Sequence, residues 1–518
     1  ALSVGGRGYL TTSRTGALNI NQLLNYSPSF GDHSFNLLLG HETKNDTYNY
    51  LYGHMTNFVD NDNKDFANAT MYQDLTSYTT EYSLEGYFGR LEYNYSNKYY
   101  LSGSYRRDGS SRFAPENRWG SFWSVGASWR LDQEGFLRSS GVIDQLKLKA
   151  SYGTQGNDNI GMTKVYNDLY EISRVDGEAS LTKYFRGNRD VTWEKSANFN
   201  AGFEASLFDR LSVNADFFIK ETKDMIYYRP LAPSQGSPSS LLVNDIDMKN
   251  TGVEFEISAD LIKTKNIRWN LSLNGTYYKN ELTKLPSDKD PNGYQAGSYW
   301  RKLGGTLYNW YTYEWVGVDP TNGLPQYNKY VKDDDGNETI EIVNKTSDAT
   351  LRDTGKSPFP DFYGGFSTTL NMYGFDLSAV FAYQIGGYIM DSYYQALMSG
   401  GGEGENWHTD IFNRWTPTNT ITDVPRVQKE SQVMNETSTR FLTSASYLNL
   451  RNLTLGYTLP KNLTKKLGLS NLRVYLVGDN LWYKSARKGL DTRQDIAGTT
   501  GYIYSALRTY SVGLTIAF

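Results

Sequence analysis

Apolar and polar residues alternate strictly through the last stretch of the chain, 508–518. One face carries Tyr510, Val512, Leu514, Ile516 and Phe518, and the other carries small or polar residues. A period of two predicts a β-strand whose two faces meet different solvents. One wholly apolar face and one small or polar face are typical of a membrane β-barrel strand, which has lipid outside and a polar lumen inside. The edge strand of a soluble β-sandwich fits this segment equally well.

The strand predicted at 119–131 separates these alternatives. Its apolar face carries a tryptophan near each end, since Trp119 and Trp129 lie ten residues apart with Trp123 and Val125 between them. At about 3.3 Å per residue the two tryptophans are about 33 Å apart. A tilt of about 40° reduces this to about 25 Å, the height of the apolar band between the two aromatic girdles of a membrane barrel.

The same alternation recurs along the chain and predicts about sixteen strands in total. The apolar phase slips by one residue at Arg451, which predicts a β-bulge. We therefore predict an all-β fold, a transmembrane antiparallel β-barrel. The further candidate strands are 3–12, 17–26, 33–50, 82–95, 99–107, 146–152, 198–205, 211–219, 253–261, 267–278, 362–372, 375–385, 447–459 and 472–482.

The predicted connections alternate between tight and long. Tight turns are expected at Gly31, Asn97, Asp209, Thr264 and Tyr373. Membrane barrels have short periplasmic turns and long extracellular loops, so this asymmetry indicates the orientation of the strands. The long segments are 51–79, 156–192, 229–247, 281–359, 391–445 and 484–501.

Composition narrows the function classes. The 518 residues include no cysteine, so a disulfide framework and thiolate metal sites are excluded. A net charge of −4 argues against nucleic-acid binding. The four histidines have no metal-ligand spacing, and the acidic run 333–338 reads as a solvated turn. We expect no enzyme activity, no cofactor and no metal.

Several motifs, in order along 33–518, resemble the SusC-like TonB-dependent transporters of the Gram-negative outer membrane. They are RRDGSSRF at 106–113 with NRWG at 117–120, LKLKASYGTQGN at 146–157, WE at 193–194, GVDP at 317–320, WTPTN at 415–419, and SYL at 446–448 with GYTLP at 456–460. The resemblance implies import of nutrient oligomers energised by TonB, with a SusD-like lipoprotein as lid and a dimer of transporter–lid pairs. Glycan is the first expectation for the substrate and peptide the second.

The family barrel has twenty-two strands, preceded by a plug domain. Residues 1–518 therefore correspond to the C-terminal part of the barrel, with about six strands and the plug outside this sequence. Unpaired strand edges are prohibitive in lipid, so we expect a second polypeptide carrying the plug and the remaining strands. A passive porin that closes alone, or a glycan-binding surface β-protein, are the alternatives.

Aromatic residues in the long segments are the candidate substrate-binding residues. Aromatic faces stack on the apolar C–H faces of sugar rings, and a site for uptake needs such faces with a few polar groups. Packing within the loops is the competing interpretation for each of them. The candidates are Trp300, Trp310, Trp315, Tyr393, Tyr394 and Trp407.

Overall fold

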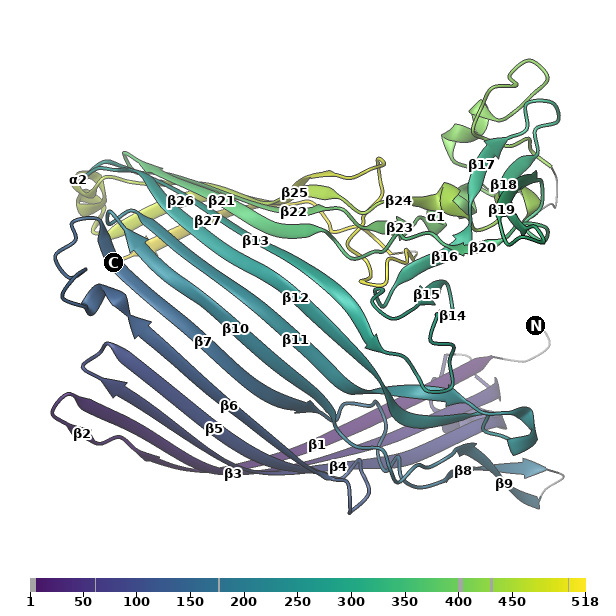
Figure 1. Cartoon of the computed structure of the whole chain (residues 1–518), viewed down its shortest axis with the longest axis horizontal. Coiled ribbons are helices and arrows are strands. Elements are labelled where there is room, and N and C mark those ends of the chain that lie inside the picture. The colour runs from purple at the N-terminus through teal and green to yellow at the C-terminus, as the bar shows by residue number, and fades with distance from the viewer. Residues whose placement is uncertain (1–5, 61, 176–177, 399–403, 429–431, 502) are drawn as a thin grey trace.

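The computed structural model describes residues 6–60, 62–175, 178–398, 404–428, 432–501 and 503–518. About half of them form one antiparallel sheet of sixteen strands that curls into a trough (Figure 1). Its strands are β1 (Arg7–Tyr26), β2 (Ser29–Phe30), β3 (His33–Phe58), β4 (Ala69–Tyr95), β5 (Tyr99–Ser110), β6 (Trp119–Arg130), β7 (Ile143–Asn157), β10 (Glu194–Leu207), β11 (Leu211–Pro230), β12 (Ser240–Lys263), β13 (Ile267–Lys284), β21 (Phe362–Met372), β22 (Phe375–Ile385), β25 (Tyr447–Thr458), β26 (Asn471–Lys484) and β27 (Thr509–Ala517).

Neighbours in the sheet are neighbours in the sequence, as in an up-and-down barrel. The two-residue β2 lies beside the turn into β3 and off the main path, which leaves fifteen strands on that path. In the described residues β1 pairs only with β3, and β27 pairs only with β26. The sheet therefore has two lateral edges, β1 and β27.

The alternation predicted for β6 is present in the structure. Trp119, Trp123 and Val125 are exposed on the outer face, whereas Phe122 between them is buried on the inner face. Toward the turn end of the sheet Trp129 stacks on Tyr99, with ring centroids 6.2 Å apart. This is the arrangement of an aromatic girdle around a lipid-facing band, so the predicted all-β membrane fold is confirmed.

The tight turns lie at one end of the sheet, as predicted (Figure 1). Asn97, Asp209 and Tyr373 adopt positive φ angles of 56°, 52° and 51°, which suit two-residue hairpins. The longer connection between β25 and β26 contains α2 (Lys461–Thr464) and the 3₁₀ turn η7 (Lys465–Leu467) at the same end. The predicted bulge is also confirmed, because the register of β25 shifts between Leu450 and Asn452.

The loop end contains more strand than the sequence indicated. Most of the predicted loop 51–79 belongs to β3 and β4, which reach 26 and 27 residues. Likewise β11 and β12 extend through most of 229–247. These extensions rise beyond the length that crosses a bilayer, where neither face has to be wholly apolar, so the strict alternation that marks a lipid-facing strand is lost.

The other connections fold into small sheets beyond the trough. They contain β8 (Leu169–Val175) paired with β9 (Glu178–Phe185), and β23 (Tyr388–Met390) paired with β24 (Leu442–Ser444). A four-stranded sheet comprises β14 (Tyr294–Ala296), β15 (Tyr299–Arg301), β16 (Asn309–Tyr313) and β20 (Leu351–Asp353), and a three-stranded sheet comprises β17 (Trp315–Val318), β18 (Pro325–Lys332) and β19 (Glu338–Val343). The short helices are α1 (Ser392–Leu397), η1 (Phe66–Asn68), η2 (Leu131–Gln133), η3 (Pro233–Gln235), η4 (Thr409–Asn413), η5 (Gln432–Asn435) and η6 (Thr439–Phe441).

The largest apolar core lies inside the wall near the loop end. Phe113 and Trp193 pack with ring centroids 5.5 Å apart, and Phe122 meets the same indole edge-on. Beside them Asp158 accepts hydrogen bonds from Ser110 (2.6 Å) and Tyr82 (2.9 Å). The RRDGSSRF segment thus joins neighbouring strands through buried polar and apolar contacts, which is an architectural role.

Candidate functional site

The long loops 281–359, 386–446 and 485–508 are joined to one another by hydrogen bonds. Tyr299 donates to the carbonyl of Ala497 (2.8 Å), and the Met390 amide donates to Gly498 (2.9 Å). Together they form one packed body at the loop end, which we call the loop assembly (Figure 1). A ligand approaching the lumen from that end meets this assembly first.

Trp310 on β16 lies at the centre of the loop assembly and is only 1% exposed. It packs with Met390, Phe441 and Leu442, and its indole N–H donates to the Tyr388 carbonyl at 2.8 Å. Because its ring is enclosed and its polar atom is satisfied, its role in this structure is packing between loops.

Tyr394 on α1 connects two apolar clusters of the loop assembly. Its hydroxyl donates to Asp410 (2.8 Å), and its ring lies 4.2 Å from the Arg487 guanidinium carbon. Burial, together with the hydrogen bond to Asp410, raises the pKa of Tyr394. Arg487 in turn pairs with Asp391, a buried residue that also caps α1 through the Tyr394 amide. This fixes α1 against the loop that contains Arg487.

Trp407 and Trp315 flank the same region from different loops. Trp407 is half-buried against the cluster of Met398, Ile411 and Val424, which also contacts Tyr394. Trp315 is half-buried, and the Arg440 guanidinium carbon lies 5.0 Å from its ring. Burial lowers the pKa of Arg440 from its usual value.

The remaining two candidates lie at the edge of this group. Trp300 on β15 stacks on Tyr311 with ring centroids 4.8 Å apart and keeps part of its surface in solvent. Tyr393 precedes Tyr394 in α1 and is half-buried. The structure thus links Trp310 and Trp407 through Tyr394 and places Trp300 on the strand paired with that of Trp310. Substrate contact stays a prediction for all six.

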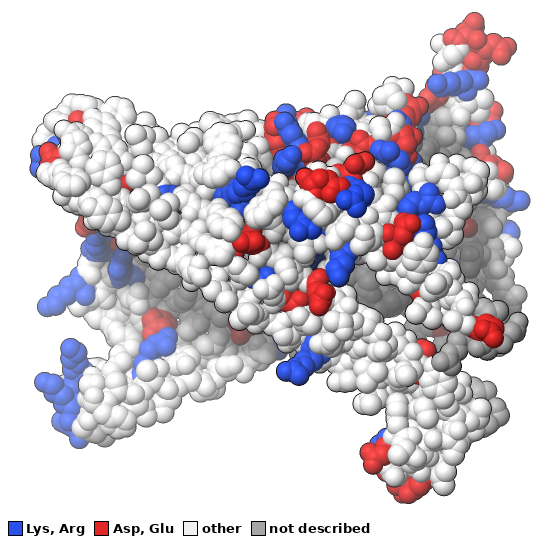
Figure 2. All heavy atoms as spheres, turned by 90° about the horizontal axis from the view of Figure 1, so that it is seen from below, with Lys and Arg blue, Asp and Glu red and all other residues white. Residues whose placement is uncertain are grey.

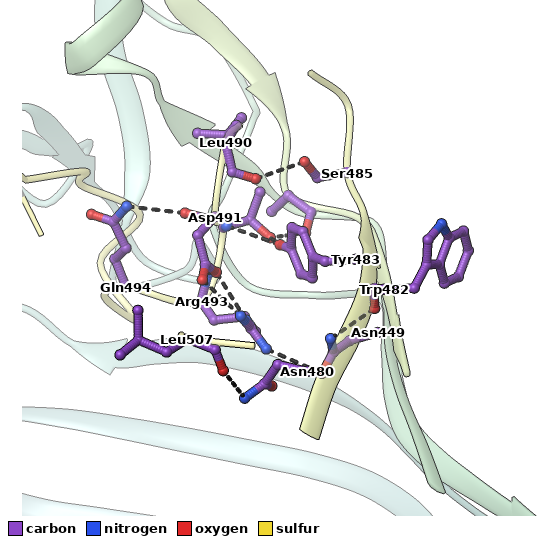
Figure 3. A network of polar contacts seen from close by, with 12 residues as sticks. Asn449, Asn480, Trp482, Tyr483, Ser485, Leu490, Asp491, Arg493, Gln494 and Leu507 are labelled. Carbon is purple, nitrogen blue, oxygen red and sulfur yellow. Dashed lines mark hydrogen bonds and ion pairs between the residues drawn. The ribbon is translucent and has the colours of Figure 1, made fainter. Parts of the chain in front are cut away.

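A polar network attaches the last loop to the barrel wall (Figure 3). Arg493 holds Asp491 with two hydrogen bonds of 2.8 and 2.7 Å and donates a third to Asn449 on β25 (3.2 Å). The guanidinium also lies 4.6 Å from the Tyr483 ring. Thr492 donates to the Ala445 carbonyl at 3.0 Å, so the loop is tied to both β25 and β26.

The network predicts an acid-sensitive loop. Burial would raise the pKa of Asp491, but the hydrogen bonds and charge of Arg493 outweigh it and hold the pKa below its ordinary value. A carboxylate whose pKa is lower in the folded loop than in the unfolded chain stabilises the folded loop. The full stabilisation is present at pH values above the pKa of the unfolded chain, which is near 4. It is lost as the pH falls through the lower pKa of the folded loop. We expect the protection of the 485–508 amides against hydrogen exchange to fall as the pH drops below about 4. Asp491→Asn should reduce that dependence, leaving the part that belongs to Asp495, whose pKa is also lowered by its hydrogen bonds, and should cost about 1.5–3 kcal/mol at pH 7. An unchanged acid profile in this variant would contradict the assignment.

The lumen wall carries paired charges. On β7, Lys149 contacts Asp216 (2.9 Å) and Glu204 (3.3 Å), and Lys147 contacts Glu204 (3.5 Å). These pairs span three neighbouring strands and face the hollow of the trough, as expected of a hydrated barrel interior.

Within the described residues no group of His, Cys, Asp and Glu is placed to hold a metal ion. Likewise, none of the described helices has the length and apolarity needed to cross a bilayer. The loop assembly presents partly exposed aromatic side chains such as Trp300 and Trp407, which suit non-covalent recognition.

Comparison with known proteins defines the class. Residues 2–481 match the family model described as "TonB dependent receptor-like, beta-barrel". The chain therefore belongs to the TonB-dependent receptor β-barrel family, which is located in the Gram-negative outer membrane.

Among curated relatives, TonB-dependent receptor P3 of Formosa agariphila is 29% identical over 99% of this chain and 54% of its own length. TonB-dependent receptor SusC of Bacteroides thetaiotaomicron is 28% identical over 97% of this chain and 50% of its own. Among solved structures, the RagAB peptide transporter is similar with a TM-score of 0.87 and 29% identity over 98% of this chain and 56% of that one. The chain spans about half the length of the curated relatives it matches.

Sequence reasoning missed the charged residues that organise the loop assembly. Asp391, Arg440 and Arg487 lie in three different segments, and no local pattern links them. Only the acidic N-cap position of Asp391 before α1 carried a recognisable signal.

Proposed function

We propose that this chain forms the larger part of an outer-membrane importer for nutrient oligomers, energised by TonB and covered by a SusD-like lipoprotein. The observation that carries the proposal is the match of residues 2–481 to the TonB-dependent receptor barrel. The loop assembly supports it, since it gathers aromatic side chains at the end where a substrate enters.

The edges of the sheet support a barrel completed by further strands. Both β1 and β27 run toward the turn end, because Tyr26 and Ala517 lie there. If these two strands met directly, they would pair in parallel, whereas closed barrels of this kind pair antiparallel with an even number of strands. An odd number of additional strands lets both β1 and β27 pair antiparallel with a neighbour. Seven additional strands would bring the fifteen strands on the path to the twenty-two strands of the family barrel. This argues against a porin that closes alone.

Those additional strands can belong to the same polypeptide or to a second one, the arrangement expected from the sequence. Each unpaired backbone group in hydrocarbon costs several kcal/mol, so the complete barrel should resist dissociation short of denaturation. Intact-mass analysis and denaturing gels of the purified complex distinguish the two cases. A complex that contains this chain and a lid protein only, with no additional strands, would refute the proposal and favour the porin.

For the substrate we propose an oligosaccharide first, because Trp300 and Trp407 expose part of their aromatic faces in the loop assembly. An oligopeptide is the second candidate, favoured by the structural similarity to RagAB, which is a peptide transporter.

The test is uptake by cells that carry the whole transporter. Fluorescent oligosaccharides and oligopeptides of equal size are supplied with and without a protonophore. We expect uptake of one class to require this transporter and to stop when the proton gradient collapses. Uptake that survives the protonophore would identify a passive pore, and binding without entry would identify a surface-binding protein.

A further inference from the structure

The turns that join neighbouring strands at one end of the sheet share an unusual chemistry. Five consecutive turns, from β6–β7 to β25–β26, follow one another along this rim. Strands are about 4.8 Å apart, so successive turns are about 10 Å apart along the rim. We call this arc the turn rim; it faces the periplasm, opposite to the loop assembly.

Exposed cations line the turn rim. Six of them make no ion pair within the described residues: Arg138, Arg210, Lys265, Lys461, Lys465 and Lys466. Most carboxylates of the same rim are held by other cations, since Asp132 pairs with Arg130 (2.6 Å), Glu134 with Lys98 (3.4 Å) and Asp209 with Lys263 (2.6 Å). Figure 2 shows blue side chains projecting from this end of the molecule, at the left. The turn rim thus presents uncompensated positive charge.

Exposed apolar residues accompany these cations. Phe136, Phe208 and Tyr373 are 72%, 58% and 67% exposed in three of the five turns, and Leu463 is exposed on α2. An aromatic ring beside a cation, at the level where a barrel leaves the bilayer, is typical of an interface anchor.

Two of these aromatic residues adopt a backbone conformation that bulky residues avoid. Phe208 and Tyr373 have φ angles of 56° and 51°, in the left-handed region that Gly and Asn occupy at lower cost. Their side chains are exposed, so contacts within the chain do not offset this strain. Contacts of the aromatic rings with surroundings outside the protein would offset this backbone strain.

From this arrangement we infer that the turn rim binds the headgroups of anionic phospholipids in the periplasmic leaflet. The cations contact the phosphates, and the aromatic rings enter the interface between headgroups and acyl chains. The lipids form a shell that holds the barrel at a defined depth. The chemistry recognised is a phosphodiester headgroup with a net negative charge, attached to acyl chains.

The test uses the purified transporter, delipidated in detergent and then titrated with phosphatidylglycerol or phosphatidylcholine, with bound lipid counted by native mass spectrometry. The variant is Lys461→Gln/Lys465→Gln/Lys466→Gln. The matched control is Lys195→Gln/Lys223→Gln/Lys279→Gln, which removes the same charge from exposed lysines toward the loop end that each contact a carboxylate.

We expect the variant to bind phosphatidylglycerol about a hundredfold more weakly, since each of the three cations near an anionic surface contributes about fivefold. Phosphatidylcholine binding and the control should be unchanged. Equal losses of phosphatidylglycerol affinity in the variant and the control, or no loss in either, would overturn the inference. If neither loses affinity, a periplasmic protein becomes the alternative partner of the turn rim. Displacement of the lipid by inorganic phosphate alone would assign the site to a free anion instead.

A second pair of variants separates binding from folding. Phe208→Asn and Tyr373→Asn place a residue that tolerates positive φ in each turn, so unfolding in detergent should occur at the same or a higher temperature. In nanodiscs that contain phosphatidylglycerol the same variants should unfold at a lower temperature than the wild type. A gain of equal size in both environments would show that the rings have no role at the membrane.

Discussion

Ile257→Arg is expected to destabilise the barrel by about 2–4 kcal/mol, the cost of placing a basic side chain on the lipid face near the bilayer midplane. Ile257 lies between Val213 and Leu273 on the neighbouring strands. These three residues form part of the outer apolar band. Equilibrium unfolding of the lipid-reconstituted transporter in guanidinium chloride measures the change.

Ser258→Arg provides the matched control at the next residue. Its hydroxyl accepts hydrogen bonds from Ser272 (2.9 Å) and Asn270 (3.2 Å) on the inner face. An arginine there loses these bonds but enters a hydrated lumen, so the barrel should tolerate it at a cost well below that of Ile257→Arg. If both positions tolerate arginine equally, lipid does not face Ile257 and the assignment of the two faces is wrong.

Trp310→Ala should cost the loop assembly about 3–5 kcal/mol, the usual penalty for removing a buried large aromatic ring. The ring is enclosed by residues of the loops 281–359 and 386–446, so its loss leaves a cavity and an unpaired carbonyl at Tyr388. We expect protease cleavage within 281–359 to accelerate and uptake to fall, while the barrel still assembles because the membrane strands are untouched.

Trp300→Ala is the comparison for this effect. Its indole stacks on Tyr311 at the edge of the assembly, and such a contact contributes about 0.5–1.5 kcal/mol. This variant should leave protease resistance nearly unchanged and reduce ligand affinity if Trp300 contacts substrate. A Trp310→Ala protein that keeps full protease resistance but loses affinity would place the Trp310 ring in the ligand site.

The membrane part of the fold could be predicted from the sequence because each membrane strand shows the alternation of apolar and polar residues by itself. On a lipid-facing strand every second residue must be apolar. The lipid-facing and lumen-facing sides of β6 and β27 can therefore be assigned from each strand's own sequence, without knowing its neighbours in the sheet. The tight turns and the bulge near Arg451 follow from the same local pattern. The long extensions of β3 and β4 could not be predicted this way, since water on both sides removes the constraint on either face.

The sequence by itself determined the class of fold, the orientation of the strands and the presence of aromatic residues in the long loops, because a bilayer imposes a period of two on each strand separately. Only the tertiary structure decided which of those aromatic residues are enclosed. Trp310 is buried by Met390, Phe441 and Leu442 of the loop 386–446, and Arg487 pairs with Asp391, which lies nearly a hundred residues earlier in the sequence. Such contacts depend on how several loops pack together, and no segment contains that information alone.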